Sequence, residues 1–173
     1  LDIQYKNVFG KEDTIVTIQI DMLLAQKFGM EYVDADGQKK TPYIIHRTSL
    51  GCYERTLASL LEKYAGALPT WLMPNQVVVV PITERTHDYA NQVAAKLKAA
   101  GVRCTVDARS EKMQYKLREA KLKKTPYILV VGDKEAEAGA VAVNARTEAK
   151  GGVKSLDEFM SQLLTEIATK ARD

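Results

Sequence analysis

The continuous apolar run at Gln76–Ile82 constrains the fold of this chain more than any other stretch. A strand this hydrophobic has no side that can face water, so it belongs inside a sheet that is covered on both faces. A helical pattern from Tyr89 that ends at Gly101 follows it, and Val102–Val106 then repeats the strand. This alternation predicts a mixed, largely parallel sheet flanked by helices.

The same alternation continues to the end of the chain. Apolar residues at helical spacing predict a helix around Met113–Ala120, and Pro126–Val131 predicts another strand. Gly132–Gly139 is rich in turn-forming residues and predicts a hairpin that leads to a short strand at Val141–Val143. Ser155-Leu-Asp-Glu158 has the spacing of a capping box, which predicts the start of the last helix.

The first third of the chain predicts antiparallel strands and one helix. Leu1–Val8 and Thr14–Ile20 are expected to pair, and Met30–Val33 and Tyr43–Thr48 are expected to pair about the Asp-Gly turn signal of residues 34–37. A buried helix from about Leu50 to Ala65, capped by Thr48 or Ser49, is expected to pack on this sheet. Gly51 in its first turn allows backbone or ligand to come close.

Composition limits the class of protein only mildly. The net charge is +3, so any surface that binds nucleic acid must be local. Cys52 and Cys104 stand far apart, which argues against a disulfide framework and favours a reducing cytoplasm. No apolar run is long enough to span a bilayer. The first residues resemble no targeting signal and lack an initiating methionine, so a chain cut from a longer protein is expected.

Two residues in the first third could carry chemistry, and each also has an ordinary interpretation. His46 in an apolar strand is more often a packed residue with a satisfied hydrogen bond than a ligand. Arg55 directly follows Glu54, so a surface ion pair on a helix explains it equally well. The residues alone leave both interpretations open.

The basic stretch from Arg109 to Lys124 concentrates the charge of the chain. Its seven positive and two negative side chains give +5, which exceeds the net charge of the whole chain. Such a helix is a fair electrostatic footprint for a phosphate backbone, and a solvated lysine-rich face is the equally weighted alternative. Tyr115 among the charges could stack on a base or be half-buried.

Several sequence blocks together resemble one family. The run Ile45-His-Arg-x-x-x-Gly-x-x-Glu-Arg55 is similar to motif 3 of class II aminoacyl-tRNA synthetases. The further blocks that match the threonyl-tRNA synthetases are Thr17–Asp21, Tyr64–Leu72, Glu111–Glu119 and Pro126–Glu135. The resemblance spans essentially the whole chain, with the blocks in the order and spacing of the family.

This resemblance implies an α/β chain, α+β overall, with two domains. Residues 1–66 would be the C-terminal part of the catalytic domain with its antiparallel sheet, and residues 67–74 a linker. Residues 75–173 would be an anticodon-binding domain with a five-stranded mixed sheet flanked by helices.

The resemblance also implies roles in the catalytic part. His46 matches one of three zinc ligands, and the other two, a cysteine and a histidine, would lie before Leu1, so no competent zinc site is expected in this chain alone. Arg55 matches the catalytic arginine that contacts the γ-phosphate of ATP, which binds with magnesium. Gln19 matches a residue of the threonine pocket, and Gly51 and Cys52 match positions near the adenosine. Cys52 is expected to pack and not to act as a nucleophile.

In the second part, the resemblance implies contacts to tRNA. The positions that match anticodon contacts of the family are Ser110, Arg118, Glu135 and Asn144. The expected basic face towards the RNA backbone consists of Lys112, Lys116, Lys121, Lys123 and Lys124. Ser110 stands where the family commonly has asparagine, and Asn144 where it has arginine, with Arg146 nearby as a substitute. These departures put strict selectivity for the threonine anticodon in question, because asparagine lacks the guanidinium fork.

The function implied for the intact protein is that of a threonine–tRNA ligase, an enzyme that activates threonine with ATP and transfers it to threonine tRNA. Such an enzyme is expected to be cytoplasmic, homodimeric and independent of membranes, and this chain is expected to be inactive alone. The alternative is a non-catalytic paralogue that binds RNA or a protein partner. Gln19, His46 and Arg55 argue against the paralogue, since an inactive protein has no reason to keep them.

Overall fold

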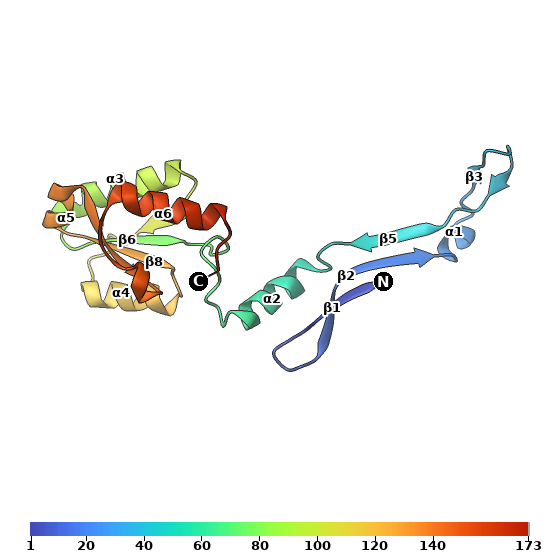
Figure 1. Ribbon diagram of the computed structural model, residues 1–173, viewed down its shortest axis with the longest axis horizontal. Helices are drawn as coiled ribbons and strands as arrows, with labels where there is room; N and C mark the ends of the chain where they lie inside the picture. Colours follow the sequence, from blue (N-terminus) through green and yellow to red (C-terminus); the bar gives the residue numbers. More distant parts are fainter. Residues whose placement is uncertain (173) are drawn as a thin grey trace. The chain divides into compact units, whose positions relative to one another are not determined.

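The computed structural model describes residues 1–172, without the side chain of Glu148. The chain divides into two compact units, Leu1–Gly66 and Ala67–Asp173, which we call the first and the second unit. Each has its own sheet (Figure 1). Across the residues that the structure describes, no helix combines the length and the apolar character needed to cross a membrane.

The first unit is built on a three-stranded antiparallel sheet in the order β1-β2-β5. The predicted pairing of the first two strands is confirmed, with an irregularity in register between Ile3 and Gln4. A short helix, α1, follows β2 and was not predicted. The elements of this unit are β1 (Asp2–Lys6), β2 (Glu12–Asp21), α1 (Leu24–Lys27), β3 (Tyr32–Val33), β4 (Lys39–Lys40), β5 (Ile44–Thr48) and α2 (Tyr53–Lys63).

The predicted partner of the strand at Tyr43–Thr48 is wrong. The turn at residues 34–37 forms, with the Gly37 N–H donating to the Asp34 carbonyl at 2.8 Å, but it joins only the two-residue strands β3 and β4. Pro42, which lacks an N–H, interrupts the chain after β4. The following strand, β5, therefore pairs with β2 instead.

Helix α2 is shorter and more exposed than predicted. Gly51 is left-handed (φ +64°) and Cys52 is extended, so the helix begins at Tyr53 with Cys52 as its N-cap, and neither Thr48 nor Ser49 caps it. None of its residues is buried, and Leu57 is half exposed. The apolar stripe of α2 is therefore only partly covered.

The second unit contains the five-stranded mixed sheet expected for it, in the order β10-β9-β8-β6-β7. Strand β6 lies between β7 and β8 and is parallel to both, whereas β9 is antiparallel to its two neighbours, β8 and β10. The strands are β6 (Val77–Pro81), β7 (Cys104–Val106), β8 (Tyr127–Val131), β9 (Ala140–Ala145) and β10 (Gly152–Ser155). The helices are the 3₁₀ turn η1 (Glu84–Thr86), α3 (His87–Ala99), α4 (Met113–Leu122), α5 (Asp133–Ala138), the 3₁₀ turn η2 (Glu148–Lys150) and α6 (Leu156–Ala168).

The sheet is covered on both faces, with unequal layers. Helices α3 and α6 lie on one face and α4 lies on the other (Figure 1). The larger core, which includes Leu97, Leu129 and Phe159, lies under α3 and α6. On the other face, Ile128 packs with Ala120 of α4. All residues of β6 are buried, as its apolar run predicts.

The predicted hairpin at Gly132–Gly139 is wrong, because the segment contains helix α5. Glu135 accepts a hydrogen bond from the Gly132 N–H at 2.9 Å, and Gly139 ends the helix in a left-handed conformation. Acidic residues in the first turn favour the positive end of a helix, which explains the outcome. The predicted cap of the last helix is confirmed, since Ser155 Oγ accepts from the Glu158 N–H at 3.2 Å.

Candidate functional site

Gln19 and His46 stand directly opposite each other in the first unit. They are partners in the register of β2 and β5, so both side chains emerge on the same face of the sheet. Asp21, two residues along β2, shares that face. A hollow of about 610 Å³ lies here, and its lining residues are Thr17, Gln19, Ile20, Asp21, Met22, His46 and Thr48.

Asp21 provides a fixed negative charge beside the imidazole. Its carboxylate accepts the N–H groups of Leu24 at 2.9 Å and Leu23 at 2.8 Å, and these two hydrogen bonds lower the pKa of Asp21. The second carboxylate oxygen lies 3.4 Å from His46 Nε2. The start of α1 thus orients Asp21, and Asp21 in turn faces His46.

The metal-ligating side chains in the first unit do not form a complete site. Within residues 1–172, no three His, Cys, Asp or Glu side chains gather closely enough to hold a metal ion. His46 has Asp21 as its acidic neighbour, whereas a zinc site with an open position uses three protein ligands. The residues present therefore do not fit a complete zinc site.

Arg55 lines a different hollow from Gln19 and His46. This second hollow, of about 520 Å³, lies between α2 and the strands β1 and β2, with Tyr5 and Thr14 among its lining residues. The structure brings Gln19 and His46 together and places Arg55 elsewhere on the unit.

Gly51 and Cys52 form the turn that leads into α2. A Cβ atom at Gly51 would lie 3.2 Å from the carbonyl oxygen of Ile15, and its φ of +64° also favours glycine. The turn can therefore cross β2 closely. Cys52 is exposed, and its thiol donates to Glu54 at 2.8 Å.

In the second unit, Asn144 lies on the sheet face that α4 covers. It pairs in register with Ile128, which packs against α4. Next to it on the same face, Val153 of β10 is 70% exposed. Arg118 is exposed on α4 itself. Beside α4, this face therefore offers an open strip of β9 and β10, which we call the open strip.

Ser110 lies in the loop between β7 and α4, and Asp107 organises that loop. The Asp107 N–H donates to Val79 of β6 at 2.9 Å. Its carboxylate accepts two hydrogen bonds from the Arg109 side chain, at 2.8 and 2.7 Å, and Arg109 also donates to Glu119 at 2.5 Å. The bond from Arg109 is the main reason why the pKa values of the Asp107 and Glu119 carboxyl groups are lowered.

Lys116 differs from the other lysines expected on the basic face. It is only 5% exposed, and its ammonium group donates to the Asp107 carbonyl at 3.1 Å. It points back under the loop because α4 packs this side against the sheet. The lysines of the predicted face that are exposed are Lys112, Lys121, Lys123 and Lys124.

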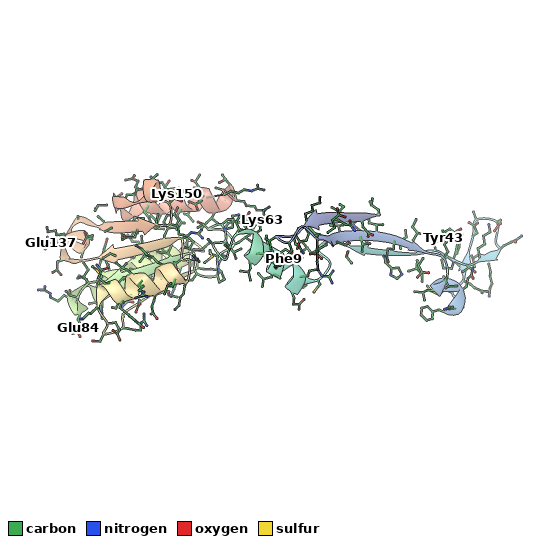
Figure 2. All side chains as sticks on the ribbon, turned by 90° about the horizontal axis from the view of Figure 1, so that it is seen from below. Phe9, Tyr43, Lys63, Glu84, Glu137 and Lys150 are labelled. Atoms are coloured by element: carbon green, nitrogen blue, oxygen red, sulfur yellow. The ribbon has the colours of Figure 1, made fainter. Side chains whose placement is uncertain are left out.

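Glu135 and Ser110 lie after the carboxyl ends of strands β8 and β7. The parallel strands end at one edge of the sheet, where Figure 2 shows Glu84 after β6 and Glu137 in α5. Asn144 lies farther away, opposite Ile128 near the start of β8, which at about 3.3 Å per residue is roughly 10 Å along the strand from its end. Ser110 and Glu135 thus lie at the ends of the parallel strands, Arg118 lies on α4 and Asn144 lies on the strand beside it, so the four predicted residues do not meet at one point.

Sequence reasoning missed Asp107 as part of this region. The signal was present, because Asp107 directly follows the strand that ends at Val106, and Arg109 lies two positions after Asp107. Such a pair can close a tight turn, but the bridge onward to Glu119 depends on how α4 packs.

Comparison with known proteins agrees with this division of the chain. Residues 76–166 match the family model of the anticodon binding domain, and residues 1–64 match that of the tRNA synthetase class II core domain (G, H, P, S and T). A threonine–tRNA ligase of Clostridium perfringens is 58% identical over 98% of this chain, and one of Streptococcus sanguinis is 49% identical over 99%. The chain spans only about a quarter of the length of these relatives, 26% and 27%.

Solved structures show the same similarity. The RNA binding domain of threonyl-tRNA synthetase from Cryptosporidium parvum matches 95% of this chain and 42% of its own, with a TM-score of 0.80 and 32% identity. A prolyl-tRNA synthetase from the same organism shares the fold, at a TM-score of 0.69 and 24% identity over 92% of this chain and 38% of its own. The chain therefore belongs to the anticodon binding domain family, joined to a stretch of the class II tRNA synthetase core, and is a homologue of the threonine–tRNA ligases.

Proposed function

We propose that the second unit binds the anticodon arm of a threonine tRNA along α4, the loop before it and the open strip. The match of residues 76–166 to the anticodon binding domain, within a chain 58% identical to a threonine–tRNA ligase, carries this proposal. The exposed lysines of α4 would contact phosphates and set affinity, because phosphate contacts position a protein without reading sequence.

The polar side chains around these lysines would recognise the bases of the anticodon. Arg118 offers a planar fork of donors, and Glu135 offers acceptor oxygens in the first turn of α5. Asn144 can donate and accept at a base edge, and Ser110 can do so through its hydroxyl group. Tyr115, half exposed on α4, offers a ring on which a base can stack.

We further propose that the chain acts as part of a longer threonine–tRNA ligase, with residues 1–66 as the C-terminal part of the catalytic domain, 67–74 as linker and 75–173 as anticodon-binding domain. Arg55 would contact the γ-phosphate of ATP, with Gly51 and Cys52 near the adenosine and Gln19 in the threonine pocket. His46 would supply one zinc ligand. Magnesium with ATP, a homodimer and a cytoplasmic location belong to the same proposal.

The test is equilibrium binding to the anticodon stem-loop of threonine tRNA at one stated salt concentration. The wild-type chain should bind this stem-loop better than stem-loops whose anticodon G or U is changed. Arg118→Ala or Glu135→Ala should reduce that preference about tenfold or more, since a good base contact contributes about 1–3 kcal/mol of discrimination. Glu137→Ala, which removes an exposed carboxylate from the same helix, is the matched control. If all stem-loops bind equally and added salt weakens binding steeply, the chain contacts only the phosphates and does not read the anticodon.

A further inference from the structure

The loop between β7 and α4, residues 107–112, is held in place by a salt bridge whose residues are not among the proposed RNA contacts. Arg109 grips both carboxylate oxygens of Asp107 and also donates to Glu119 of α4. Paired guanidinium–carboxylate bonds fix direction as well as distance. The bridge therefore connects the loop that carries Ser110 to the helix that carries Arg118.

Asp107 is itself firmly placed. Its side chain is 14% exposed, its N–H donates to Val79 of strand β6, and its carbonyl accepts from the buried Lys116. One end of the Arg109 bridge is thus anchored in the sheet. The other end, at Glu119, lies one residue beyond Arg118 on the helix.

We propose that Arg109 is a positioning residue for anticodon reading, which sets the place of Ser110 relative to Arg118 by bridging Asp107 and Glu119. This inference rests on the proposed function. Arg109 is half exposed, but its Nε and Nη2 donors are engaged by two protein carboxylates that also balance its charge. It therefore acts through the loop, and the two base-reading side chains depend on it for their separation.

Two variants break the bridge, one at its centre, Arg109, and one at its end on α4, Glu119. Arg109→Lys keeps the charge but loses the planar fork, and Glu119→Gln removes the acceptor charge on α4. Each should lower the ratio of affinities for native and altered anticodon stem-loops about tenfold. The double variant should be no worse than either single variant, because both lose the same bridge. The salt dependence of Arg109→Lys should equal that of the wild type, since the charge is unchanged.

The matched control is Arg47→Lys, which makes the same exchange at an exposed arginine of β5 in the first unit and should leave the ratio unchanged. The positioning role would be overturned if Arg109→Lys kept the wild-type ratio of affinities. It would also be overturned if the double variant lost the product of the two single losses, which would point to direct contact between Arg109 and RNA. Should Arg109→Lys not fold, Glu119→Gln alone decides. If the wild-type chain binds native and altered stem-loops equally, the proposed function and this inference both fail. If the wild-type chain prefers the native stem-loop, the proposed function stands whatever the variants show.

Discussion

At the scale of single residues, the charge of Asp107 determines how the loop before α4 responds to pH. Its pKa is lowered in the folded chain, chiefly by the hydrogen bonds from Arg109. A carboxyl group whose folded pKa lies below its unfolded value, about 3.9, stabilises the fold above that value, and the contribution is lost as pH falls through the folded pKa. The bridge should therefore persist at neutral pH and weaken in acid.

Asp107→Asn should lower the free energy of unfolding of the second unit by about 1 kcal/mol at pH 7, since a bond to a charged group is lost. The difference from the wild type should shrink as pH falls below about 4, because Asp107 then takes up a proton in the unfolded chain before it does so in the folded one. Urea unfolding followed through the single tryptophan, Trp71, at pH 7 and pH 3 measures this. A difference that is equal at both pH values would contradict the role of the charge.

At the scale of elements, the cap of α6 tests whether local sequence signals control the helices. Ser155 Oγ accepts the Glu158 N–H, so Ser155→Ala leaves one helix N–H without its partner and should cost about 1 kcal/mol. Ser161→Ala, an exposed position within the same helix, is the control and should be neutral or slightly stabilising, because alanine favours helices. Urea unfolding of both variants by Trp71 fluorescence decides, and equal midpoints would show that the cap contributes nothing.

At the scale of the whole molecule, burial is divided very unequally. Among the described residues, Ala25 is the one buried apolar side chain of the first unit. All the other buried apolar side chains belong to the second unit. Hydrophobic burial is the dominant favourable term in folding, so the second unit should fold alone. Residues 67–173 should show the same urea midpoint by Trp71 fluorescence as the whole chain, while limited proteolysis should cut first within residues 1–66. A clearly lower midpoint for 67–173 would mean that it depends on the first unit.

Several features of the fold were predicted from the sequence because their causes are local. The unbroken apolar run of β6 requires cover on both sides, and Ser155 and Glu158 place the start of α6 by their spacing. The motif around His46 and Arg55 likewise indicates the family without any structure. The roles that this motif implies for single residues stay predictions.

Other features depend on residues distant in sequence and emerged only in the tertiary structure. Strand β5 pairs with β2, more than twenty residues away, although a strong turn signal lies just before it. From the sequence, Lys116 is expected to be one more surface lysine, and only the packing of α4 turns its side chain inward to Asp107. Local sequence sets the periodicity and caps of each element, whereas pairing partner, burial and charge bridges are decided by the free energy of contacts that form once distant elements meet.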